Sequence, residues 1–201
     1  MRTDLITALI GLTLAAAPLA QALPISQAHI PVKASEWGQL SDAAKSGYAL
    51  GAMQVAAYIE SDSSAQSGCI SRLDEALIDF LNNGSSESNF VVFDAMEMAM
   101  DACGSAPAQD DGLISVERVS SVLGDEQTSE VWYGLVIGMT DYLKIQVYGT
   151  VGEAAADCVE DISLGMAGID FSDPSRWTDD PDESFVGLVA NAALTECGLI
   201  D

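Results

Sequence analysis

The chain has 201 residues, of which 31 are acidic and 7 are basic, so its formal net charge at pH 7 is -24. A surface this anionic repels nucleic acid and anionic lipid, which excludes both as binding partners. The explanations that remain for the charge are a basic protein partner, a divalent cation and adaptation to a saline habitat. Apolar residues make up 49% of the chain, enough for one medium core or two small cores.

Residues 1–22 have the pattern of a secretory signal peptide. The apolar run Leu5–Leu14 is followed by alanines and by Ala20-Gln21-Ala22, a small-x-small cleavage pattern. This run is shorter than the ~20 residues that span a bilayer, and no later segment is apolar enough to do so. We therefore expect an exported, soluble protein, with no membrane contact after cleavage.

A pattern of glycines and cysteines occurs twice in the chain. Residues 47–51 read GYALG and residues 134–138 read GLVIG, and each segment is followed by two cysteines, the second of which precedes a glycine. Features that recur in one order indicate two copies of one module. The predicted organisation is a signal peptide at 1–22, a leader at 23–40, module 1 at 41–104, a linker at 105–127 and module 2 at 128–201.

Helical periodicity predicts about three helices in module 1. Ser41 is a candidate N-cap for the first, whose apolar residues recur at steps of three and four. The second is expected at about 70–82, where Ser71 and Asp74 would form a capping box. The third is expected at about 88–103, ending at Gly104.

Module 2 repeats this pattern, and the whole chain is therefore predicted to be all-α. Apolar stripes run from Val131 to Ile145, from Cys158 to Ile169 and from Val186 to Cys197. A short helix is expected in the linker at about 116–123. The glycines spaced by four residues lie on one helical face in each copy, where a second helix can approach closely.

The four cysteines are predicted to form one disulfide in each module. In an antiparallel helix pair the start of one helix lies beside the end of the next, and Cys69 and Cys103 stand at two such ends. The same holds for Cys158 and Cys197, so we select these two bridges from the three connectivities that four cysteines allow. Zinc binding is the alternative, but the sequence has no CxxC or HxxxH spacing.

The sequence indicates no catalytic site. The single histidine, His29, lies in the leader without a positioned partner, the cysteines are assigned to disulfides, and no GxSxG motif is present. The Asp110–Gly112 turn is similar to part of a calcium loop, yet Pro107, Gln109 and Arg118 would occupy positions that require acidic ligands. We expect no enzyme activity, no cofactor and no metal site.

The connection between the last two helices of module 2 is the largest difference between the copies. It is rich in Asp, Pro and Trp, so it could hold a cation or contact a basic partner, and a solvated loop is the alternative. The candidate partner-contact residues are Asp173, Trp177, Asp179, Asp180, Asp182 and Glu183.

Both copies carry a pattern that resembles the Tai/Rap family of periplasmic immunity proteins. In that family a GYxxG-like segment on a first helix is followed by a cysteine, an amphipathic helix and a final helix that ends in cysteine. The matching positions in the first copy are Gly47, Tyr48, Gly51, Cys69, Leu73, Leu77, Leu81, Ala99 and Cys103. Those in the second copy are Gly134, Gly138, Cys158, Ile162, Met166, Ala193 and Cys197.

This resemblance implies an all-helical periplasmic protein that protects the cell against a peptidoglycan-cleaving amidase delivered by type VI secretion. Members of the family cover the active cleft of the toxin, often as dimers, so a basic toxin partner and a homo-oligomer are expected. Two alternatives from other classes remain open. One is an acid-responsive periplasmic chaperone, and the other is an exported structural protein without a discrete partner.

Overall fold

The computed structural model describes residues 31–61, 64–103, 112–122, 129–165, 178–180 and 182–200, and the predicted signal peptide lies outside them. The elements in chain order are η2 (Ala34–Gln39), α2 (Asp42–Glu60), α3 (Ser64–Ile70), α4 (Asp74–Asn82), α5 (Val91–Ala102), α6 (Val116–Val122), α7 (Ser129–Thr150), α8 (Glu153–Gly165) and α9 (Phe185–Glu196). The described residues form no strand beyond two isolated β-bridges, which confirms the predicted all-α fold class.

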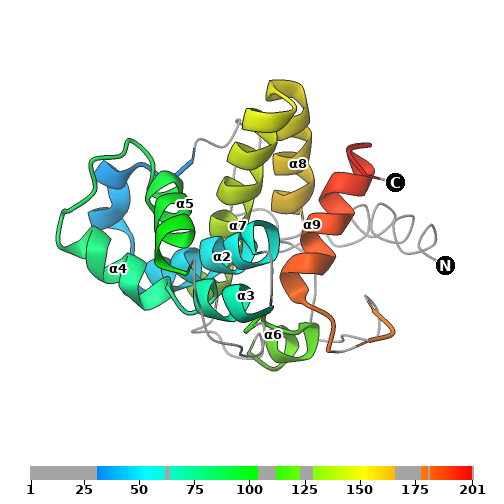
Figure 1. Ribbon diagram of the computed structural model, residues 1–201, viewed down its shortest axis with the longest axis horizontal. Helices are drawn as coiled ribbons and strands as arrows, with labels where there is room; N and C mark the ends of the chain where they lie inside the picture. The colour runs from blue at the N-terminus through cyan, green and yellow to red at the C-terminus, as the bar shows by residue number, and fades with distance from the viewer. Residues whose placement is uncertain are drawn as a thin grey trace.

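The two longest helices, α2 and α7, cross and pack against each other at the centre of the structure (Figure 1). Near their N-terminal ends the Ser41 hydroxyl donates a hydrogen bond to Glu130, and near their C-terminal ends the Gln146 amide donates to Glu60. Helices α3, α4 and α5 pack against α2, and α8 packs against α7. The pair α2 and α7 is therefore the seam between the first half of the described chain, 31–103, and the second half, 112–200.

Four glycines allow the backbones of α2 and α7 to touch. A Cβ built on any of them would overlap a carbonyl oxygen of the other helix, so no larger residue fits at this distance. The contacts are Gly47 with Val131, Gly51 with Leu135, Gly134 with Ala44 and Gly138 with Tyr48. The close helix approach expected from the glycine spacing is thus present. The first helix of one copy, α2, packs against the first helix of the other copy, α7.

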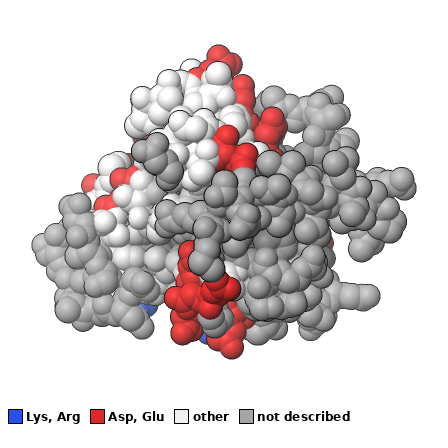
Figure 2. Space-filling model, turned by 90° about the vertical axis from the view of Figure 1, so that its right-hand side faces the viewer, with Lys and Arg blue, Asp and Glu red and all other residues white. Residues whose placement is uncertain are grey.

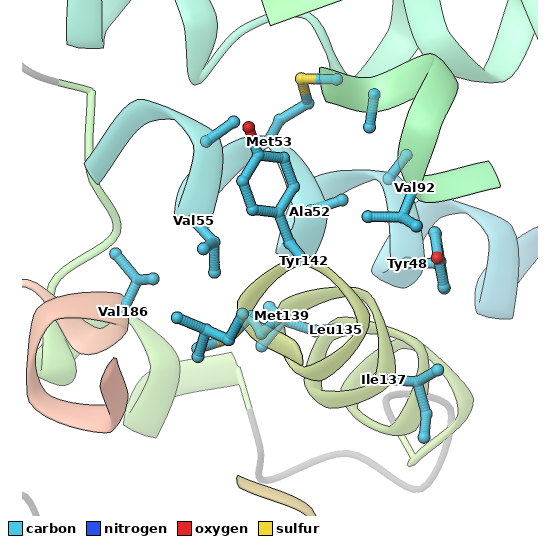
Figure 3. Close-up of a cluster of buried hydrophobic side chains, with 14 of the residues drawn as sticks. Tyr48, Ala52, Met53, Val55, Val92, Leu135, Ile137, Met139, Tyr142 and Val186 are labelled. Atoms are coloured by element: carbon cyan, nitrogen blue, oxygen red, sulfur yellow. The ribbon is translucent and has the colours of Figure 1, made fainter. Parts of the chain in front are cut away.

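Buried side chains from both halves form one hydrophobic cluster around this seam. Tyr142 of α7 is fully buried among Ala52, Met53 and Val55 of α2, and Val186 of α9 lies beside them (Figure 3). The division into modules at 41–104 and 128–201 stays a prediction, because the core of the described residues extends across both. None of the described helices is both long enough and apolar enough to cross a membrane.

Part of the predicted leader and part of the predicted linker are folded. Lys33 forms a β-bridge to Phe90 just before α5, and the η2 helix that follows buries Trp37. In the linker, Ser115 forms a β-bridge to Ser184 just before α9, and the expected short helix is present as α6. Each central helix is therefore preceded by a short folded segment, which we call its leading segment: 31–39 before α2 and 112–122 before α7.

The described part of predicted module 1, 41–104, contains one more α-helix than predicted. Cys69 lies in the last turn of α3 rather than at the start of the second helix, and α4 begins only at Asp74. The predicted capping box was wrong: Leu73 occupies the N-cap position, and the Ser71 hydroxyl donates to the Gly68 carbonyl instead. The Ser41 cap is present, because its side chain accepts a hydrogen bond from the Ala44 amide at 3.1 Å.

Both predicted disulfides are present. Cys69 and Cys103 have Cα atoms 5.9 Å apart, and those of Cys158 and Cys197 are 6.0 Å apart. Each bridge joins the end of the last helix of a half to a helix that follows the central one. All four cysteines of the chain are thus paired, and each half is closed by its own cross-link.

The glycine contacts generate a prediction about stability. Gly51→Ala should destabilise the fold by about 1–3 kcal/mol, because the added methyl group pushes α2 away from the Leu135 carbonyl and outweighs the better helix propensity of alanine. The control is Gly149→Ala on α7, where nothing lies within 4 Å of the built Cβ, so no loss is expected. Urea unfolding followed by circular dichroism measures both, and equal stabilities would contradict the role of the contact.

The disulfides generate a second prediction. Replacing Cys69 and Cys103 together by alanine should lower the free energy of unfolding by about 3–4 kcal/mol, since the bridge closes a loop with a sequence separation of 34. Urea unfolding of the oxidised proteins measures the loss. A peptide map without reductant should show Cys69 joined to Cys103, and a link from Cys69 to Cys158 or Cys197 would refute this arrangement.

Candidate functional site

The leading segments are held crosswise by polar side chains of the central helices. Asp141 of α7 accepts a hydrogen bond from the Val32 amide at 2.9 Å, and Val32 precedes α2. Gln54 of α2 accepts one from the Ile114 amide at 2.8 Å and donates one to the Gly112 carbonyl at 3.1 Å, and both residues precede α7. Each central helix therefore satisfies the backbone of the segment that leads into the other.

Asp141 is fully buried and also accepts a hydrogen bond from the Tyr48 hydroxyl at 2.6 Å. A buried carboxylate requires such donors because removing the charge from water is costly. Burial raises the pKa of Tyr48 well above its ordinary value, and the negative charge and hydrogen bond of Asp141 raise it further. The pair is thus built to keep a neutral phenol beside a carboxylate, and it lies inside the core rather than in a cleft.

Two further sets of polar contacts join α7 to neighbouring helices. Burial and the nearby Glu60 charge raise the pKa of Tyr142, whose hydroxyl donates to Glu60 at 3.3 Å. Lys144 forms an ion pair with the buried Glu160 of α8, and Asp157 lies 3.6 Å from the same ammonium group. Since these groups connect one helix to the next, we interpret them as structural.

A pocket of about 470 Å³ opens between the seam and α6. Its walls come from α2, α7, the leading segment of α7 with α6, and Ser71 between α3 and α4, and they are mostly apolar. The lining residues are Leu50, Gln54, Ser71, Gly112, Leu113, Ile114, Arg118, Val119, Val131, Trp132 and Leu135. The Trp132 ring packs on Phe185 at a centroid distance of 5.6 Å, so this wall is backed by the start of α9.

The acidic segment predicted to contact a partner lies beside the start of α6. The Glu183 carbonyl accepts a hydrogen bond from the Val116 amide at 2.9 Å, which fixes the segment to the start of α6. Within it, the Thr178 hydroxyl donates to Glu183 at 2.7 Å and the Asp182 amide donates to Asp180 at 3.1 Å. The segment is therefore tied down by hydrogen bonds, and it carries its charges next to α6.

The candidate contact residues are only partly brought together. Asp179, Asp180 and Asp182 are exposed and Glu183 is partly buried, whereas Asp173 and Trp177 lie outside the described residues. Figure 2 shows an acidic patch low on one face, at the height of α6 and of segment 178–184 in Figure 1. No group of three or more metal-ligating side chains that could hold an ion occurs among the residues that the structure describes.

Sequence reasoning missed the residues that shape this region. Gln54 and Asp141 are single polar residues within apolar helices, and each pairs with a segment 60 or 109 residues away in sequence. The one available signal is that the two residues occupy matching positions in the repeat, 87 residues apart like Gly47 and Gly134 (141 minus 54 and 134 minus 47). The pocket itself had no signal in the sequence.

Comparison with known proteins identifies no relative: no protein-family model, no curated protein and no solved structure matches this chain.

The Tyr48 and Asp141 pair yields a third prediction. Tyr48→Phe should lower the free energy of unfolding at pH 7 by about 1–3 kcal/mol, because the buried carboxylate loses a donor. In the wild type, unfolded Tyr48 ionises at about pH 10 while the folded residue stays neutral, so stability falls as the pH rises above 10. The variant lacks this phenol, and its decline with pH should be shallower by up to about 1.4 kcal/mol per pH unit.

Urea unfolding between pH 7 and pH 11 measures both effects. Tyr133→Phe is the matched control, because Tyr133 lies on the same helix α7 with 44% of its surface exposed. It should change stability at pH 7 by less than about 0.5 kcal/mol. A Tyr48→Phe variant as stable as this control would show that the buried pair contributes little.

Proposed function

We propose that this protein is a non-enzymatic binding protein of an oxidising, exported compartment, and that it acts as an immunity protein that covers the active cleft of a peptidoglycan amidase. The two disulfides support an exported location, because such bridges persist where thiols are not kept reduced. The resemblance of both copies to periplasmic immunity proteins supports the inhibitory role.

The observation that carries the proposal is the ordered acidic segment on α6. Asp179, Asp180 and Asp182 project from a backbone that is hydrogen-bonded to the start of α6, so little conformational entropy is lost when they meet a partner. The formal net charge of the whole chain, -24, has the same sign as this segment. Such a field accelerates the encounter with a basic protein and is screened by salt.

The fourth prediction tests this function with an amidase encoded beside the gene for this protein. The purified protein should bind the amidase and stop its cleavage of peptidoglycan, and the association rate should fall by about tenfold or more between low and physiological salt. Asp179→Asn combined with Asp182→Asn should slow association several-fold and leave the fold unchanged, because both side chains are exposed.

The matched control removes the same charge elsewhere. Glu75→Gln combined with Asp79→Asn changes two exposed acids of α4, which lies at the opposite side of the molecule in Figure 1. This variant should associate nearly as fast as the wild type. If the wild type does not bind the amidase, and instead exposes dye-binding apolar surface at pH 3, the acid-responsive chaperone becomes the better proposal.

A further inference from the structure

The pocket beside α6 has a counterpart in the first half of the chain. The two leading segments make the same contacts: the Val91 amide donates to the Val32 carbonyl at 2.9 Å, and the Phe185 amide donates to the Ile114 carbonyl at 2.8 Å. The β-bridges follow at Lys33 and at Ser115. Lys33 of one segment therefore corresponds to Ser115 of the other.

The central helices correspond in the same way. Gly47 of α2 contacts Val131 of α7, and Gly134 of α7 contacts Ala44 of α2. Each helix therefore makes the same kind of contact with the other. This reciprocity is that of a two-fold interface within one chain. The register pairs Gly47 with Gly134, 87 residues apart, and hence Tyr48 with Leu135 at the same separation (135 minus 48).

In the first half, the positions that correspond to two pocket-lining residues hold an indole and a phenol ring. Trp37, four residues after Lys33, is 2% exposed and packs edge-on against Tyr48 at a centroid distance of 6.0 Å. Its indole nitrogen donates to Asn82 at 3.1 Å, and the Lys45 ammonium lies 5.8 Å from the ring centroid. The Trp37 ring thus has an aromatic neighbour, Tyr48, and a cation, Lys45.

In the second half, smaller side chains occupy these two positions. The residue four positions after Ser115 is Val119, in place of Trp37, and the counterpart of Tyr48 is Leu135. Both Val119 and Leu135 line the pocket. The pocket of about 470 Å³ is thus lined by the two residues that correspond to Trp37 and Tyr48 of the first half.

We propose that this pocket binds a small planar aromatic molecule of the size of indole. Leu50, Val119 and Leu135 offer apolar surface for the ring, and burying that surface drives binding. Trp132 and Arg118 also line the pocket, and aromatic and guanidinium side chains are the types that favour an aromatic ring beyond area alone. The volume lies within the range of about 300–1,000 Å³ that is usual for small-molecule sites. This ligand site does not depend on the amidase proposal.

Indole itself is the probe. Titrated into the full-length exported protein with labelled methyl groups, it should shift the Val119 and Leu135 signals saturably and give nuclear Overhauser contacts from the ring to both. Val119→Trp restores the residue of the first half and should weaken indole binding about tenfold or more, since the new ring occupies the space. Val151→Trp adds the same side chain just after the C-terminal end of α7, at a position 60% exposed, and should bind indole like the wild type.

Two results would overturn the proposal. One is a titration of the wild type that shows no saturable shift, or contacts of indole to methyl groups outside the pocket. The other is a folded Val119→Trp variant that binds indole as tightly as the wild type. Leu135→Tyr fills the pocket from α7 and should also weaken binding, and the contact pattern in the wild type decides the matter even where neither variant folds.

Discussion

The direct contact between the backbones of α2 and α7 is the constraint on which the other packing depends. With glycine at four positions of the seam, the helix axes come close enough for Tyr48 to reach Asp141 and for Tyr142 to enter the space among the α2 side chains. Dense packing transmits any change at the seam to these neighbours, because interiors leave few voids for side chains to move into. The outer helices α5 and α9 then each contact the central helix of the opposite half.

Polar groups specify the arrangement that the glycines permit. A buried carboxylate such as Asp141 favours the one register in which donors surround it, and Gln54 uses both ends of its amide on the other leading segment. Apolar packing alone tolerates alternative arrangements of similar volume, whereas an unpaired buried charge does not. The crosswise hydrogen bonds therefore tie the order of the helices to the identity of single residues.

Local sequence signals predicted the parts of the fold that local physics decides. The Ser41 cap, the central helices, the short helix at 116–122 and the two disulfides follow from periodicity, capping and spacing. The separate α3 helix, the burial of Trp37 and the pocket depend on contacts between distant segments, and one sequence contains no direct record of these. The acidic segment was found from composition alone, and its role as a partner contact stays a prediction.

The placement of the two sulfur bridges has a consequence for how the molecule comes apart. Each bridge closes within one half, so only the peptide chain between Cys103 and Gly112 joins the halves covalently. If a protease cut the chain there, the contact between α2 and α7 and the crosswise hydrogen bonds would still hold the two fragments together. The product would be a non-covalent heterodimer in which each fragment keeps its own disulfide. One polypeptide thus has the construction of a dimer whose subunits have been fused.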